Sequence, residues 1–159
     1  MSPHTLMVHS RIRLLLAALA LAVSANAQQV PFQMQYTQGP ITNTLTNDSL
    51  LTLAASLGQS QSIQVRATYL GIGEVTISQP PSVTGSTAFT ATLNQTLPLK
   101  LTPGQAVFFS VRFSPLSAAA DAARVTLAFA EVPASTISPI TLSLQGVTSA
   151  VIPSYTTAD

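Results

Sequence analysis

The chain has 159 residues, no cysteine, two histidines and a charged fraction of only 7%. Disulfide scaffolds and cysteine-ligated zinc sites are therefore excluded. The formal net charge of +1 comes with no basic run, so nucleic acid is not an expected partner. Both histidines, His4 and His9, lie within an N-terminal segment that has the features of a removable leader.

The first 27 residues have the pattern of a secretory signal peptide. Arg11 and Arg13 precede an apolar run at Leu14–Val23, and small residues follow at Ser24–Ala27. This order predicts cleavage before Gln28. The apolar run is too short for a bilayer-spanning helix, which needs about 20 residues. We expect a secreted or periplasmic product that has no membrane contact after cleavage.

Cleavage leaves residues 28–159, a length that suits one domain. We expect a β-sandwich domain over residues 28–148. Residues 149–159 form either a C-terminal tail or the start of a following repeat, because Ile152-Pro-Ser-Tyr155 echoes Val30-Pro-Phe32. The mature segment has no histidine and no cysteine, so the commonest general base and one common nucleophile are absent.

Alternation of apolar and polar residues with a period of two runs along most of the mature segment. This period indicates β-strands with one buried face, and the runs are separated by proline and glycine, as turns require. In chain order, the alternating residues are Phe32, Met34 and Tyr36; Leu51 and Leu53; Ile63, Val65, Ala67 and Tyr69; Val75 and Ile77; Phe89, Ala91 and Leu93; Val107, Phe109, Val111 and Phe113; Val125, Leu127 and Phe129; and Ile140, Leu142 and Leu144, before Gly146. The pattern predicts an all-β protein, an antiparallel β-sandwich of about 7–8 strands.

One segment has helix-favouring composition. Leu116–Ala123 is rich in alanine, but it is too short to be stable as an isolated helix. We expect a single helical turn that bridges two strands.

Several motifs resemble a known domain family. The segment Thr102-Pro-Gly-Gln-Ala-Val-Phe-Phe-Ser-Val-Arg-Phe-Ser-Pro115 is similar to the central motif of ASH-type (abnormal-spindle/hydin-like) domains, as found in bacterial choice-of-anchor D proteins. Gly58–Gln61, Gly71–Ile77 and Ser138–Gly146 match the family pattern in the same order, so the resemblance covers roughly residues 43–147. It implies an immunoglobulin-like sandwich of about seven strands with no known catalytic residues.

The residue types leave few routes to catalysis or to a bound cofactor. A glycosidase needs two carboxyl groups about 5–9.5 Å apart, and no two acidic residues of the mature segment are adjacent in sequence. The only lysine, Lys100, lacks a serine at the S-x-x-K spacing. We therefore predict that the protein is not an enzyme, and we assign no catalytic, cofactor-binding or metal residue. The acidic residues of the mature segment are Asp48, Glu74, Asp121, Glu131 and Asp159.

The strand with the strongest alternation suggests an interaction surface on its other face. If Phe109 points inward, Phe108 and Arg112 point outward, and aromatic residues and arginine are typical of contact surfaces. Phe108 and Arg112 are therefore the candidate interaction residues. The alternative is that Phe108 covers the rim of the sheet or packs beneath the 118–123 segment.

Together these features predict an exported, non-enzymatic structural or interaction module of the cell envelope or extracellular space. Its expected partners are neighbouring domains, cell-envelope proteins or glycans. A PapD-like periplasmic chaperone, which acts through a strand edge, and a carbohydrate-binding module are the alternatives. The basic residues show no clustering in sequence, as a chaperone would need. The chain has no tryptophan and three tyrosines, few platforms for a sugar ring.

Overall fold

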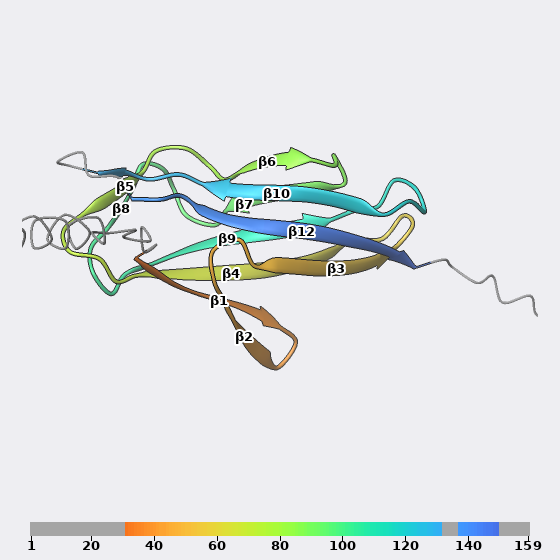
Figure 1. Cartoon of the computed structure of the whole chain (residues 1–159), viewed down its shortest axis with the longest axis horizontal. Coiled ribbons are helices and arrows are strands. Elements are labelled where there is room, and N and C mark those ends of the chain that lie inside the picture. Colours follow the sequence, from red (N-terminus) through yellow and green to blue (C-terminus); the bar gives the residue numbers. More distant parts are fainter. Residues whose placement is uncertain (1–30, 132–136, 150–159) are drawn as a thin grey trace, which may run out of the picture.

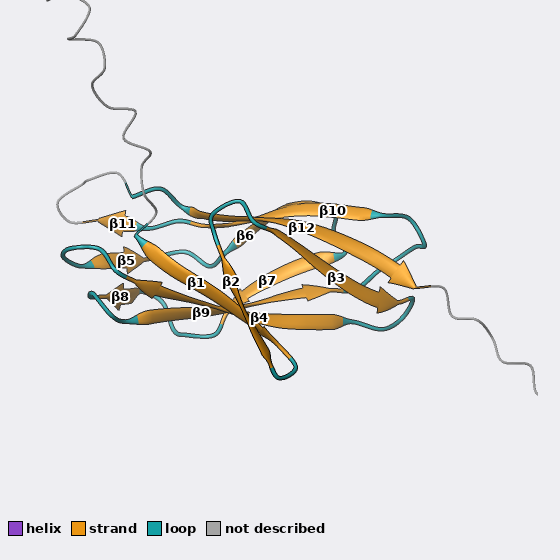
Figure 2. Cartoon of the chain, turned by 60° about the horizontal axis from the view of Figure 1, so that its bottom comes forward, coloured by secondary structure: helices purple, strands orange, loops and turns teal. Residues whose placement is uncertain are grey.

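The structure, a computed structural model, describes residues 31–131 and 137–149, without the side chain of Glu131. Within these ranges the chain forms twelve strands and no helix (Figure 2). The expected signal peptide and the Ile152–Tyr155 echo lie outside the described residues. The strands are β1 (Phe32–Gln38), β2 (Ile41–Leu45), β3 (Leu50–Ser56), β4 (Gln61–Tyr69), β5 (Val75–Ile77), β6 (Ser82–Gly85), β7 (Phe89–Leu93), β8 (Leu99–Leu101), β9 (Ala106–Phe113), β10 (Asp121–Leu127), β11 (Ala130–Glu131) and β12 (Ile140–Ser149).

The strands form two main sheets and a small third one. The five-stranded sheet has the order β2-β1-β4-β9-β7, and the four-stranded sheet has the order β3-β12-β10-β6. The three-stranded sheet, β11-β5-β8, lies at one end of the molecule (Figure 1). The predicted all-β sandwich is confirmed. It departs from a purely antiparallel arrangement at one place, because β3 pairs with β12 in parallel.

The core lies between the two main sheets and follows the predicted alternation. The inward side chains of β9 are completely buried, whereas Ser110 is half-buried and Arg112 is exposed on the other face. Rings that are distant in sequence fill the two ends of the core: Phe89 packs against Phe113 with centroids 4.8 Å apart, and Phe32 stacks on Phe129, between β10 and β11, at 4.5 Å. The inward residues of β9 are Val107, Phe109, Val111 and Phe113.

Four of the strands have no clear sequence signal. In β2 only Leu45 is buried, and in β6 no residue is fully buried, so neither strand shows apolar alternation. The strands β8 and β11 span three and two residues, too few to display a period. Each of these strands is defined by the backbone ladder that it shares with a neighbouring strand. The expected total of 7–8 strands is therefore too low.

The predicted helical turn at Leu116–Ala123 is wrong. No residue of this segment is helical, and Asp121–Ala123 begin strand β10. The register pairs Asp121 with Gly146 and Ala123 with both Leu144 and Gly85. Hydrogen bonding to a strand on each side overrides the weak helical preference of a short alanine-rich segment.

The molecule is elongated, and the long strands run between its two ends (Figure 1). We call the end where β1 begins the entry pole. It is formed by the β4–β5 loop (residues 70–74) and the β8–β9 turn (residues 102–105). We call the opposite end, where β12 ends, the exit pole, which is formed by the β3–β4 turn (residues 57–60) and the β9–β10 loop (residues 114–120). No described helix has the length and apolarity needed to cross a membrane.

Candidate functional site

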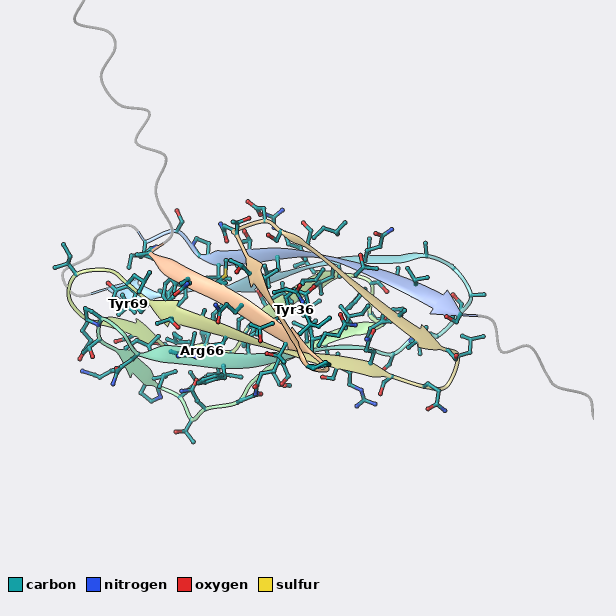
Figure 3. The ribbon with its side chains drawn as sticks, turned by 90° about the horizontal axis from the view of Figure 1, so that it is seen from below. Tyr36, Arg66 and Tyr69 are labelled. Carbon is teal, nitrogen blue, oxygen red and sulfur yellow. The ribbon has the colours of Figure 1, made fainter. Side chains whose placement is uncertain are left out.

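The two residues predicted from sequence lie on the outer face of the five-stranded sheet. Because β4 pairs with β1 on one side and β9 on the other, Gln35, Arg66 and Phe108 form one row across three strands. Arg66 thus lies at the middle of this row, between β1 and β9 (Figure 3). Arg112 is further along β9, opposite Ser62 and Thr90. We call this surface the outer face.

Arg66 covers the aromatic ring of Phe108. The Arg66 guanidinium carbon lies 5.9 Å from the Phe108 ring centroid, within the range of a cation–π interaction. Phe108 is half-buried in consequence. It lies five residues before the end of β9, one residue beyond the last pair of the β7–β9 ladder. The side chain forms a mixed aromatic and cationic patch with Arg66.

The backbone of Phe108 is held by residues that follow the end of β7. The Phe108 N–H donates to Gln95 Oε1 at 2.8 Å, and the Asn94 N–H donates to the Phe108 carbonyl at 2.9 Å. Gln95 Nε2 also donates to the carbonyl of Ala106 at 3.3 Å. The Gln95 side-chain amide therefore makes the hydrogen bonds to β9 that a neighbouring strand would make. In this way the backbone of Phe108 stays hydrogen-bonded although β7 ends at Leu93.

Two positive charges on the outer face have no acidic partner among the described residues. The two ion pairs in this part of the molecule join Lys100 to Glu74 and Arg124 to Asp48, so neither involves Arg66 or Arg112. From a rise of about 3.3 Å per residue and a strand spacing of about 4.8 Å, the α-carbons of the two arginines are about 14 Å apart. The face is polar, exposed and positively charged at two separate points.

The described acidic side chains, those of Asp48, Glu74 and Asp121, lie in three different parts of the molecule, away from the outer face. Glu74 is in the β4–β5 loop at the entry pole, and Asp121 begins β10 beside the exit pole. Ser86 Oγ donates to Asp121 Oδ1 at 2.5 Å, while Asp121 Oδ2 is buried without a hydrogen-bond partner. Asp48 accepts a hydrogen bond from Thr141 Oγ1 at 2.7 Å on the four-stranded sheet. Each described carboxylate is held at a different place.

The part of the chain that the structure describes contains no group of three or more His, Cys, Asp or Glu side chains that could hold a metal ion. The expectation of no metal or cofactor stays a prediction, as does that of no enzymatic activity.

The sequence singled out Phe108 and Arg112 as candidates but not their neighbours Arg66, Asn94 and Gln95. Arg66 lies between buried Val65 and Ala67, so the alternation alone predicts that its side chain points outward. Its contact with Phe108 depends on the register between β4 and β9. These strands are distant in sequence: Tyr69, the last residue of β4, donates its N–H to the carbonyl of Gln105, which lies 36 residues later, just before β9. No local pattern carries that register.

No protein-family profile matches the sequence, and no curated protein matches it. Among solved structures, the Vibrio cholerae VesB protease is similar, with a TM-score of 0.51 and 16% identity over 64% of this chain and 31% of that chain. The chain thus spans about a third of that protein's length. At this identity the likeness concerns the fold alone.

A second similar structure is the ASH/PapD-like domain of human CEP192, with a TM-score of 0.44 and 15% identity over 92% of this chain and 99% of that one. The immunoglobulin-like sandwich expected from the ASH-type resemblance is the fold that the described residues adopt.

Proposed function

We propose that this protein is an exported, non-enzymatic interaction module that binds its partner through the outer face of the five-stranded sheet. The observation that supports this proposal is the Arg66–Phe108 pair, together with Arg112, on a face where neither arginine has a carboxylate partner within the described residues. Arginine and aromatic residues dominate binding energy at protein interfaces. The proposed partner is a neighbouring domain or cell-envelope protein that presents acidic groups.

The rigidity of this surface favours binding. Phe108 is part of the eight-residue strand β9, and its backbone is hydrogen-bonded to Asn94 and Gln95. A side chain that is already ordered loses less conformational entropy when a partner binds. The guanidinium of Arg66 can form paired hydrogen bonds to a carboxylate while it still lies over the ring.

The two alternative functions receive less support from this geometry. A PapD-like chaperone would need basic side chains that converge on one client carboxylate, whereas Arg66 and Arg112 are about 14 Å apart by strand geometry. A carbohydrate-binding module usually offers an open aromatic platform, whereas Phe108 is half-buried and lies under Arg66. Both alternatives stay as outcomes of the test.

The test uses the mature protein, residues 28–159, as bait for envelope proteins and measures the dissociation constant of each captured partner. Phe108→Ala and the double variant R66Q/R112Q should each weaken binding by about tenfold or more, as expected for central interface residues. Thr84→Ala is the matched control, because Thr84 is exposed on the four-stranded sheet. Its affinity should equal that of the unmodified protein.

The stability of each variant is measured alongside, so that weaker binding is not mistaken for unfolding. Undiminished affinity in both outer-face variants would refute this surface as the binding site. Binding to a neutral oligosaccharide that Phe108→Ala abolishes would favour the carbohydrate-binding alternative. Binding to a peptide only through its free C-terminal carboxylate would favour the chaperone.

A further inference from the structure

The basic side chains that lack a described acidic partner share one surface, the outer face of the five-stranded sheet. The two ion pairs among the described residues involve the other two basic side chains, Lys100 and Arg124. Arg66 and Arg112 are both exposed on the outer face. The described carboxylates lie elsewhere, in the β2–β3 connection, in the β4–β5 loop and at the start of β10. An anion that approaches this face therefore meets two guanidinium groups that no described carboxylate neutralises.

The two positive charges follow the direction of β9. Arg112 belongs to β9 itself. Arg66 belongs to β4, but its guanidinium carbon lies 5.9 Å from the ring centroid of Phe108, which is on β9. Phe108 and Arg112 are four residues apart in the strand, so their α-carbons are separated by about 13 Å at a rise of about 3.3 Å per residue. The cation–π contact thus defines where along β9 the charge of Arg66 lies.

The outward side chains between the two charges are neutral and polar. Ser110 is the outward residue of β9 midway between them, and it lies opposite Gln64 of β4 and Thr92 of β7. The Ser110 hydroxyl is hydrogen-bonded to the side chain of Asn94, at 3.0 Å from Nδ2 and 3.1 Å from Oδ1. The small Ser110 side chain is thus held against the sheet, and it leaves room for a chain that lies along β9.

An extended polypeptide matches the spacing of the two charges, whereas a helix does not. In an extended segment, residues i and i+4 point to the same side of the chain and lie about 13 Å apart. In an α-helix, which rises about 1.5 Å per residue, residues about 13 Å apart are eight or nine positions apart and point in different directions. Carboxylates at positions i and i+4 of an extended segment can therefore meet both arginines at once.

We propose that the ligand of the outer face is an extended acidic segment of a partner protein, with carboxylates at positions i and i+4, that lies along β9. This inference rests on the binding surface proposed above and names the chemistry of its ligand. One carboxylate binds the Arg66 guanidinium beside the Phe108 ring and the other binds Arg112, each through paired N–H···O hydrogen bonds. A second copy of this sequence does not supply such a segment, because its closest acidic residues, Asp121 and Glu131, are ten residues apart.

Short fluorescent peptides that carry two glutamates among neutral residues test this spacing. Fluorescence anisotropy gives their Kd for the mature protein at low ionic strength, where exposed charges are screened least. The peptide with glutamates at i and i+4 should bind several-fold more tightly than one of identical composition with glutamates at i and i+3, which point to opposite sides of an extended chain. Arg66→Gln and Arg112→Gln should each abolish this preference. Arg124→Gln is the matched control and should retain it, since Arg124 is exposed on the four-stranded sheet.

Phe108→Ala provides a second readout, because it keeps both charges but removes the ring that positions Arg66. This variant should still bind acidic peptides, with a smaller difference between the two spacings. Equal affinities of the unmodified protein for the two spacings, or no measurable binding of the i and i+4 peptide, would overturn the inference. If the outer-face variants nevertheless weaken binding of a captured envelope protein, the proposed binding surface itself stands. Tighter binding of an acidic polysaccharide or of polyphosphate than of every acidic peptide would also overturn the inference.

Discussion

Gly146 illustrates how one residue adapts a strand to the core. It lies inside β12, on the inward face, and a β-carbon built on it would overlap Cε2 and Cζ of Phe113. The Phe113 ring therefore packs directly on the backbone of the opposite sheet. The strand continues to Ser149, beyond the glycine at which the alternation had suggested an end, because residues 147–149 pair with Ala54–Ser56 of β3.

Replacing this glycine tests the contact. Gly146→Ala should lower the free energy of unfolding by about 1–3 kcal/mol, because an added methyl group forces a packed ring to move. Chemical denaturation of the mature protein gives the value, and Gln145→Ala, at the exposed neighbouring residue, is the matched control, with a change within about 0.5 kcal/mol. An unchanged stability for Gly146→Ala would mean that Phe113 does not lie against the backbone of β12.

At the scale of elements, the connection between β2 and β3 is hydrogen-bonded to β12 and so positions β3 for parallel pairing with it. The Asp48 N–H donates to the Thr141 carbonyl at 2.7 Å, and the Thr141 N–H donates to Asn47 Oδ1 at 2.7 Å. Asp48 has a φ of 61°, a conformation that Asp and Asn tolerate better than most residues. Its carboxylate also accepts from Arg124 and from Thr141 Oγ1. The connection thus continues the hydrogen bonding to β12 from β3 back to Asn47.

The Asn47 side chain should therefore contribute measurably to stability. Asn47→Ala leaves the Thr141 N–H, which is partly buried, without its acceptor, and we expect a loss of about 1–3 kcal/mol in the free energy of unfolding. Asn47→Asp, which keeps an oxygen at this place, should lose less. Thr44→Ala serves as the control, since Thr44 is exposed on β2. If Asn47→Ala and Thr44→Ala had equal effects, the side chain would not complete the ladder.

Elements differ in how far the sequence predicts them. The strands β4 and β9 were readable, because their inward residues alternate with polar ones over eight or nine residues. The strands β2, β6, β8 and β11 were not, because pairing with neighbours and not burial of an apolar face defines them. The same limit applies to the candidate site. Outward direction follows from alternation, which identified Phe108, whereas the Arg66–Phe108 contact requires a register between distant strands.

At the scale of the whole molecule, the three described carboxylates lie in separate parts of the fold. Asp48 lies on the four-stranded sheet beside Arg124, Glu74 is at the entry pole beside Lys100, and Asp121 is bonded to Ser86 near the exit pole. Paired carboxylates of a glycosidase act at about 5–9.5 Å from each other. The three described carboxylates are instead used in separate local contacts, each of which supports the structure around it.

We therefore expect the mature protein to show no hydrolytic turnover and no stoichiometric metal. The physical reason is that an activated nucleophile needs a base within hydrogen-bond reach, and the mature segment has neither histidine nor cysteine and only one lysine. That lysine, Lys100, is bound to Glu74. Plasma mass spectrometry measures metal content, and a panel of glycoside, ester and peptide substrates measures turnover. Activity that Asp121→Asn or Glu131→Gln removes, while Asp48→Asn retains it, would contradict this expectation. It would locate a catalytic site at Asp121 or at Glu131, whose side chain is not among those described.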